Sequence, residues 1–147
     1  MIEKEYWANL LPPLAPSELD VIIYKENMLI GSTLLLGSTR QLIRLSNVQM
    51  DINPQDYLPN PINQDWLTNI NYYDNIIGDG VTVFNKELCD GIIKMASECC
   101  KKLIIRSFNK KLPITRIASY FPMAEDFIIH PTIIKIFDEY TFYIWQF

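Results

Sequence analysis

The sequence has few of the residues from which phosphate-binding loops and metal sites are built. Its 147 residues include five glycines and a single histidine, His130. One histidine excludes a Ser/His/Asp triad unless His130 itself serves, and it removes the Cys/His pairings typical of zinc sites. Since Pro131 follows it, we expect His130 in a loop or at the entry of a strand, and we predict no metal site.

Basic charge and long apolar runs are also scarce. Seventeen acidic residues against thirteen basic ones give a net charge of −4. Proteins that bind nucleic acids usually carry a basic face, so we expect no nucleic-acid partner. No apolar run reaches the roughly 18 residues that a membrane-spanning helix requires, and the acidic opening MIEKEY is unlike a signal peptide. We therefore expect a cytoplasmic protein with no membrane partner.

Cysteine is scarce and clustered. The three cysteines, Cys89, Cys99 and Cys100, fall in one predicted helix, and an odd, clustered set argues against the disulfide framework of a secreted protein. We expect reduced, partly buried thiols. A chain of this length fits one domain, and no repeat or low-complexity tract divides it. We predict a single domain over residues 1–147, with residues 1–30 as a helical lead.

Short apolar strands alternate with helices along the chain. Strands are expected at 33–37, 48–52, 62–64, 73–77 and 102–108, and helices at 3–10, 17–28, 40–45, 113–120 and from Asn85 through the cysteines. That last helix has one face spaced for burial: Leu88, Ile92, Met95, Ala96 and Cys99. Two β-rich runs that flank Asp138-Glu139 predict a C-terminal antiparallel hairpin. The alternation predicts an α/β fold, a mostly parallel sheet with helices on both faces.

The ends of the expected strands carry glycines and carboxylates. Gly37 ends the first strand, Asp51 the second, Asp65 follows the third, and Gly78, Asp79 and Gly80 follow the fourth. In open α/β sheets, ligands bind outside these carboxyl ends. Asp51, roughly 14 positions after Gly37, is placed to hold ribose hydroxyls, or it is an ordinary turn residue before Asn53-Pro54.

Asp65 and Trp66 offer a second pair of contacts. The Asp65 carboxylate suits an exocyclic amine and Trp66 offers an aromatic face, although a lone tryptophan also packs readily in a core. Gly78 and Gly80 either let the backbone approach a ligand or form a turn. A dinucleotide needs a G-x-G-x-x-G turn or a P-loop lysine, and GSTRQL supplies neither. A phosphate-free, positively charged ligand with a ribose and an amine fits this edge better.

In their order and spacing, these segments resemble the class I S-adenosylmethionine-dependent methyltransferases. The segments that carry the resemblance are PLAPSELD as a proline-rich lead, LLLGSTRQL as a variant first cofactor loop, VQMDIN as the second motif, NQDWL as the adenine-contacting motif and YDNIIGDGVTVF as the fourth-strand motif. The resemblance implies a Rossmann-like sheet with strand order 3-2-1-4-5-7-6. It also implies S-adenosylmethionine as the cofactor and a small molecule or a protein as the methyl acceptor.

The resemblance further implies a set of cofactor-binding residues: Gly37, Ser38, Thr39, Asp51, Ile52, Asp65, Trp66, Gly78, Asp79 and Gly80. Asp79, Tyr72 or Tyr73 are candidates to contact the acceptor or the cofactor. The loop LLLGSTRQL resembles that of one bacterial branch of the family, and the sequence departs from that branch at Ser38 and Arg40, where the branch more often has small apolar or Pro/Glu residues. No catalytic side chain is identified.

Two other functions stay open. A methyltransferase-like domain without turnover would serve as a binding or assembly module, for which the aromatic segment YTFYIWQF suggests a homodimer. An Arg40 side chain inside the cofactor crevice would favour that alternative. A nicotinamide-linked oxidoreductase shares the Asp51 argument but lacks the phosphate loop.

Overall fold

A computed structural model describes residues 30–37, 43, 45–52, 54, 56–79, 85–108, 123–136 and 140–147. The helices expected at 3–10, 17–28 and 113–120 lie outside these residues, as does most of the one expected at 40–45. No helix among the described residues is long and apolar enough to cross a membrane.

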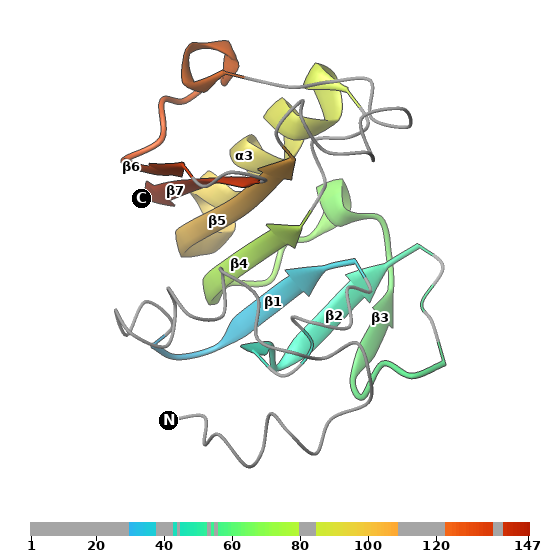
Figure 1. Cartoon of the computed structure of the whole chain (residues 1–147). Coiled ribbons are helices and arrows are strands. Elements are labelled where there is room, and N and C mark those ends of the chain that lie inside the picture. Colours follow the sequence, from blue (N-terminus) through green and yellow to red (C-terminus); the bar gives the residue numbers. More distant parts are fainter. Residues whose placement is uncertain are drawn as a thin grey trace.

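The described part of the chain forms a seven-stranded mixed sheet (Figure 1). The strands are β1 (Thr33–Leu36), β2 (Val48–Asp51), β3 (Pro61–Asn63), β4 (Tyr73–Asp79), β5 (Cys100–Phe108), β6 (Ile133–Ile136) and β7 (Tyr140–Gln146). Their order across the sheet is β3-β2-β1-β4-β5-β7-β6. The first five are parallel, and β7 runs antiparallel between β5 and β6. The expected strand order and the C-terminal hairpin are confirmed.

The central strands contain short continuous apolar runs because both faces of the sheet are buried there. Leu34, Leu35 and Leu36 of β1 are each at most 1% exposed, although successive side chains point to opposite faces. The same holds for Ile76 and Ile77 in β4, which are fully buried. Short apolar runs of this kind are what the sequence predicted for strands inside a parallel sheet.

One helix, α3 (Lys86–Cys99), covers a face of the sheet beside β4 and β5 (Figure 1). Asn85 caps it as expected: its side chain accepts a hydrogen bond of 2.8 Å from the Leu88 backbone N–H. The buried residues of the helix are Cys89, Ile92, Ile93, Met95, Ala96 and Cys99. Leu88, expected on this face, is only partly buried, because the stripe with spacing i, i+3, i+4 and i+7 starts at Cys89 instead.

Two expected boundaries were wrong. Cys100 is not helical: α3 ends at Cys99, and Cys100 adopts an extended conformation as the first residue of β5. Gly78 does not lie in a turn after β4, because the strand continues through it to Asp79. It pairs with Leu36 on one side and Ile105 on the other, so hydrogen bonding to two neighbouring strands keeps this glycine in the sheet.

The C-terminal hairpin brings aromatic rings together at the end of the core. Phe127, which follows the short 3-10 helix η5 (Ala124–Asp126), stacks edge-on against Tyr143 and Trp145 at centroid distances of 4.8 and 5.2 Å. The Trp145 indole donates a 2.8 Å hydrogen bond to the Ile129 carbonyl. These contacts tie the segment before β6 to the hairpin.

Candidate functional site

Because β1 to β4 are parallel, their carboxyl ends share one edge of the sheet (Figure 1). Leu36 is paired with Met50 of β2 and with Gly78 of β4. Gly37 and Asp51, one position further along their strands, are therefore neighbours across the sheet. Two of the predicted ligand-binding residues are thus placed side by side by strand register alone.

The Met50 carbonyl joins three segments at this edge. It accepts a 2.8 Å hydrogen bond from the Gly37 backbone N–H and a 2.7 Å hydrogen bond from the Trp66 indole Nε1–H. A Cβ added to Gly37 would lie 3.8 Å from Cζ2 of Trp66, so the indole lies next to the glycine. Trp66 is also packed against the main hydrophobic core. The aromatic face and the core packing that the sequence left as alternatives are therefore combined in one side chain.

Gly37 has a φ of +106°. Residues other than glycine rarely adopt a φ in this range. The backbone at the end of β1 therefore depends on Gly37, even though the multi-glycine pattern is missing. One glycine at this position is therefore enough to supply the backbone conformation that the end of β1 requires.

Asp65 sits at the start of the short 3-10 helix η2 (Trp66–Thr68). Its Oδ1 accepts a 2.9 Å hydrogen bond from the Leu67 N–H, which fixes the carboxylate beside Trp66. Among the described residues, no hydrogen bond reaches its second oxygen, and the residue is exposed. Asp65 can therefore cap η2 and still accept a hydrogen bond from a ligand.

Asp51 and Ile52 end β2 beside this group. The Asp51 carbonyl accepts a 3.0 Å hydrogen bond from the Gln64 N–H, which holds the end of β3 next to β2. Ile52 is 69% exposed, so its side chain forms an apolar surface at the edge. Asp51, Asp65 and Trp66 thus come from two successive strand ends that backbone hydrogen bonds hold together.

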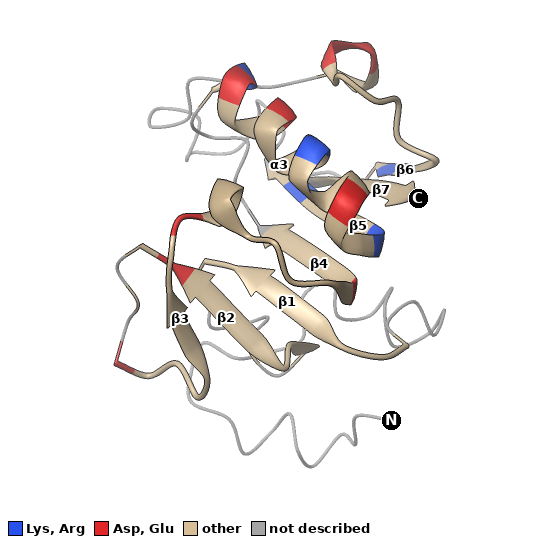
Figure 2. Ribbon diagram, turned by 180° about the vertical axis from the view of Figure 1, so that it is seen from behind, with Lys and Arg blue, Asp and Glu red and all other residues tan. Residues whose placement is uncertain are grey.

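The ends of β2 and β3 carry negative charge. The described residues between 30 and 79 include no lysine or arginine, and Asp51 and Asp65 lie at or just after the ends of β2 and β3 (Figure 2). Arg40 and Arg44 belong to the same stretch of sequence but fall outside the described residues. Carboxylates at the ends of β2 and β3 attract a positively charged ligand and disfavour a pyrophosphate.

The structure describes only some of the remaining predicted site residues, and not all of those lie at the carboxyl edge. Asp79 is the last residue of β4 and lies at the same edge, whereas Ser38, Thr39 and Gly80 fall outside the described residues. Tyr72 and Tyr73 precede or begin β4 and so lie at the opposite end of that strand. The suggestion that they contact an acceptor at the carboxyl edge was therefore wrong. Burial also raises the pKa of the Tyr73 hydroxyl.

Sequence reasoning missed Gln49, which is fully buried in β2. Its Oε1 accepts a 2.9 Å hydrogen bond from the Asn60 N–H and its Nε2 donates a 2.9 Å hydrogen bond to the Ser46 hydroxyl. The first bond connects β2 to the residue before β3, and the second connects β2 to the segment that precedes it. A single glutamine within the strand VQMD was the signal, but its partners are not apparent from the sequence. Within the described ranges, no group of three His, Cys, Asp or Glu side chains could hold a metal ion.

Comparison of the sequence with protein-family models gives no match, and comparison with curated proteins gives none either. Solved structures do match the fold. Magnesium protoporphyrin IX methyltransferase from Synechocystis PCC 6803 with bound S-adenosylmethionine superposes with a TM-score of 0.56 and 17% identity, covering 84% of this chain and 73% of that one.

Two further structures give the same result. Ribosomal protein L11 methylase from Lactobacillus delbrueckii subsp. bulgaricus has a TM-score of 0.55 and 14% identity, covering 93% of this chain and 83% of that one. A fibrillarin/Nop5p complex has a TM-score of 0.54 and 14% identity, covering 89% of this chain and 81% of that one. At such low identity the likeness establishes the fold, and the chain has the Rossmann-like fold of the class I methyltransferases.

Proposed function

We propose that this chain, which has the class I methyltransferase fold, is an S-adenosylmethionine-dependent methyltransferase that binds its cofactor at the carboxyl edge of β1 to β3. The observation that carries the proposal is the arrangement of Gly37, Asp51 and Trp66 around the Met50 carbonyl. It supplies a close backbone approach, a carboxylate and an aromatic ring within one short stretch of the edge. Two of the matching structures, both of the Synechocystis enzyme, contain S-adenosylmethionine or S-adenosylhomocysteine, which supports the choice of cofactor.

The carboxylates and the apolar side chains at the edge fit this cofactor. Asp51 would accept hydrogen bonds from the two ribose hydroxyls, and the second oxygen of Asp65 would accept one from the adenine amine. Trp66 and the exposed Ile52 would pack against the adenine ring. We place Ser38 and Thr39, which follow Gly37, and Gly78, Asp79 and Gly80 at the end of β4, in the same cofactor-binding set.

The cofactor supplies a methyl group bonded to a positively charged sulfur. The protein contributes chiefly position, because methyl transfer of this kind needs an aligned acceptor rather than a side-chain nucleophile. The carboxylates at the edge also favour a cationic ligand over its neutral product. Asp79, at the end of the neighbouring strand, is the residue we propose to contact the acceptor or the amino group of the cofactor.

Calorimetric titration with S-adenosylmethionine and S-adenosylhomocysteine tests the proposal. We expect saturable binding of both, and we expect Asp51→Ala to weaken it at least about tenfold, which corresponds to about 1.4 kcal/mol. Asp56→Ala is the matched control, since it removes an exposed carboxylate from the loop before β3 and should leave the affinity unchanged. The absence of heat with either ligand at high micromolar concentration would overturn the proposal.

A second candidate function is a binding or assembly module. The observation in its favour is the edge strand β6, which among the described strands pairs only with β7 and exposes Ile134 and Ile136, the latter 76% exposed. An edge strand with apolar side chains is a template for pairing with a second copy. Light scattering should then show a dimer that Ile136→Lys converts to a monomer, whereas a wild-type monomer at high concentration rules the dimer out. The single domain over residues 1–147 and the cytoplasmic location stay predictions.

A further inference from the structure

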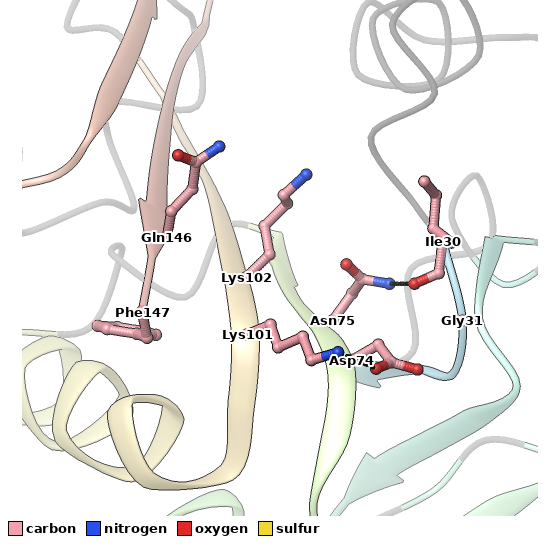
Figure 3. A pocket seen from close by; sticks show the side chains of 8 residues that line it. All are labelled: Ile30, Gly31, Asp74, Asn75, Lys101, Lys102, Gln146 and Phe147. Atoms are coloured by element: carbon pink, nitrogen blue, oxygen red, sulfur yellow. Dashed lines mark hydrogen bonds and ion pairs between the residues drawn. The ribbon is translucent and has the colours of Figure 1, made fainter.

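A cavity of about 440 Å³ lies at the opposite end of the sheet from the proposed cofactor edge, beside Asn75 (Figure 3). Its charged side chains already have partners: Asp74 lies 3.6 Å from the Lys101 ammonium, and Lys102 has an interaction of its own. At the cofactor edge, by contrast, Asp65 keeps one carboxylate oxygen to which nothing in the described part of the chain donates. Asp65 is therefore the better indicator of what this protein binds.

Three hydrogen bonds hold the backbone that carries the Asp65 carboxylate. The Thr68 hydroxyl donates to the Asp65 carbonyl at 2.7 Å, and the Thr68 N–H donates to the same carbonyl at 3.1 Å. Gln64 completes the set, because its Nε2 donates to the Thr68 hydroxyl at 3.0 Å. A hydroxyl has one proton to donate, and the hydrogen bond that it accepts from Gln64 directs that proton to Asp65.

The short helix η2 is also anchored independently of these side-chain bonds. Backbone carbonyls at the end of β2 accept hydrogen bonds from the Gln64 N–H at 3.0 Å and from the Trp66 indole at 2.7 Å. On the other side, Leu67 packs against α3, since a Cβ added to Gly91 would lie 3.0 Å from Leu67 Cδ2. Loss of the Thr68 hydroxyl would therefore shift the Asp65 peptide without detaching η2 from the sheet.

The free oxygen of Asp65 distinguishes one kind of purine from another. Its other oxygen, Oδ1, accepts the 2.9 Å hydrogen bond from the Leu67 N–H. An ionised carboxylate only accepts hydrogen bonds, so it attracts the exocyclic amine of adenine and repels the carbonyl oxygen that replaces this amine in hypoxanthine. Hydrogen bonds weaken steeply when their distance and angle are poor. The preference for adenine therefore depends on how accurately the carboxylate is held.

We propose that Thr68, oriented by Gln64, is a positioning residue that sets the preference of the cofactor site for adenine over hypoxanthine. Thr68 acts through Asp65, whose carbonyl it holds, and has no contact of its own with the base. This role rests on the proposed cofactor site, because it requires that Asp65 face the adenine ring. It assigns base selectivity to two side chains outside the set that contacts the cofactor.

Calorimetric titration with S-adenosylhomocysteine and S-inosylhomocysteine measures this selectivity, because the second ligand has a carbonyl oxygen in place of the amine. The wild type should bind S-adenosylhomocysteine at least about tenfold more tightly. Thr68→Val keeps the shape of the side chain and removes its hydroxyl. It should weaken S-adenosylhomocysteine about three- to tenfold and leave S-inosylhomocysteine unchanged, whereas a purely structural loss would weaken both ligands alike. Thr68→Ser, which keeps the hydroxyl, should restore the selectivity.

A double variant and a matched control test the chain of hydrogen bonds. Gln64→Leu should also lower the selectivity, and Gln64→Leu/Thr68→Val should lower it no further than Thr68→Val alone, because both residues act through one hydroxyl. Thr132→Val is the control: it removes an exposed hydroxyl that accepts a 3.0 Å hydrogen bond from the Gln146 N–H, before β6. It should leave both affinities unchanged.

The outcomes separate this role from the cofactor proposal. Asp65→Asn presents an amide that can donate to a carbonyl oxygen, so it should bring the two affinities closer together. If Asp65→Asn changes the selectivity and Thr68→Val does not, the role of Thr68 is overturned and the cofactor site stands. Equal affinity of the wild type for the two ligands, or a Thr68→Ser variant as unselective as Thr68→Val, also overturns it. If neither ligand binds the wild type, the cofactor proposal fails and this role fails with it.

Discussion

Alanine substitutions at Gly31 and Gly37 should separate two contributions to the loss of stability: the cost of a positive φ for a residue with a side chain, and the cost of a steric clash. Both glycines have a positive φ, +96° at Gly31 and +106° at Gly37, and an L side chain in such a conformation costs about 1–2 kcal/mol. At Gly37 the nearest atom to a new Cβ is Cζ2 of Trp66 at 3.8 Å, an ordinary contact. At Gly31 the new Cβ would overlap the Asp74 carboxylate. The two substitutions share the backbone cost, and only one adds a steric clash.

For Gly37→Ala we expect a loss of about 1–2 kcal/mol in the free energy of unfolding, a fall in Tm of roughly 3–6 °C for a chain of this size. Gly31→Ala should lower the Tm further. To admit the methyl group, the Asp74 carboxylate has to leave its 2.9 Å hydrogen bond with the Ser32 N–H and its position near Lys101.

Thermal and urea unfolding of Gly31→Ala, Gly37→Ala, Asp74→Ala and the double variant Gly31→Ala/Asp74→Ala checks this reasoning. With the carboxylate removed, the new methyl group still lies 2.9 Å from the Asp74 Cβ, which is closer than an ordinary contact, so part of the steric cost remains. Gly31→Ala should then cost less than it does with the carboxylate present, but more than Gly37→Ala costs in the wild type. The reasoning is refuted if Gly31→Ala costs the same with and without the Asp74 carboxylate.

Three further predictions concern stability. The pKa of Asp74 is lowered, chiefly by the Ser32 backbone hydrogen bond, so its contribution is present above the unfolded pKa of about 3.9 and is lost as the pH falls through the lower folded value. The Tm difference between wild type and Asp74→Asn, measured by calorimetry, should therefore close on acidification from pH 7, and a constant difference would contradict this. Burial raises the pKa of Cys89 and Cys100 to about 12. Because the unfolded thiols lose their protons first, each should reduce the free energy of unfolding by about 1.4 kcal/mol per pH unit above about pH 9. In urea titrations Cys89→Ala should show a shallower slope than wild type. Asn85→Ala should cost about 1 kcal/mol through loss of the helix cap, whereas Asn85→Asp, which keeps the acceptor, should not, and an equal loss in both would exclude capping as the cause.

The strands were predictable because each leaves a local signature. Leu34, Leu35 and Leu36 form an uninterrupted apolar run that ends at Gly37, and burial on both faces of a parallel sheet requires such a run. The helix that begins after Asn85 was found for a similar reason, since capping and apolar spacing both act within a few residues. The order of the strands does not follow from these signals and came instead from the resemblance to a family.

What could not be predicted depends on partners distant in sequence. Gly78 looked like the start of a turn because glycine usually ends a strand, but its pairing with β1 and β5 keeps it extended. The hydrogen bond from Trp66 to the Met50 carbonyl joins residues whose side chains give no sign of it, because every residue has a backbone carbonyl. The cavity beside Asn75 likewise forms only when β1, β4, β5 and β7 are assembled.

The position of Trp66 gives the proposed cofactor site an intrinsic optical reporter. Its indole is partly exposed, is hydrogen-bonded to Met50 and lies next to Gly37, so a ligand that covers the ring changes the solvent around a fluorophore already built into the edge. Trp145 is 1% exposed and lies in the hairpin, away from this edge, and Trp7 lies outside the described residues, so the Trp66→Phe variant is needed to assign a signal to Trp66. Quenching or a spectral shift in the wild type that disappears in Trp66→Phe would follow occupancy of the site without a label.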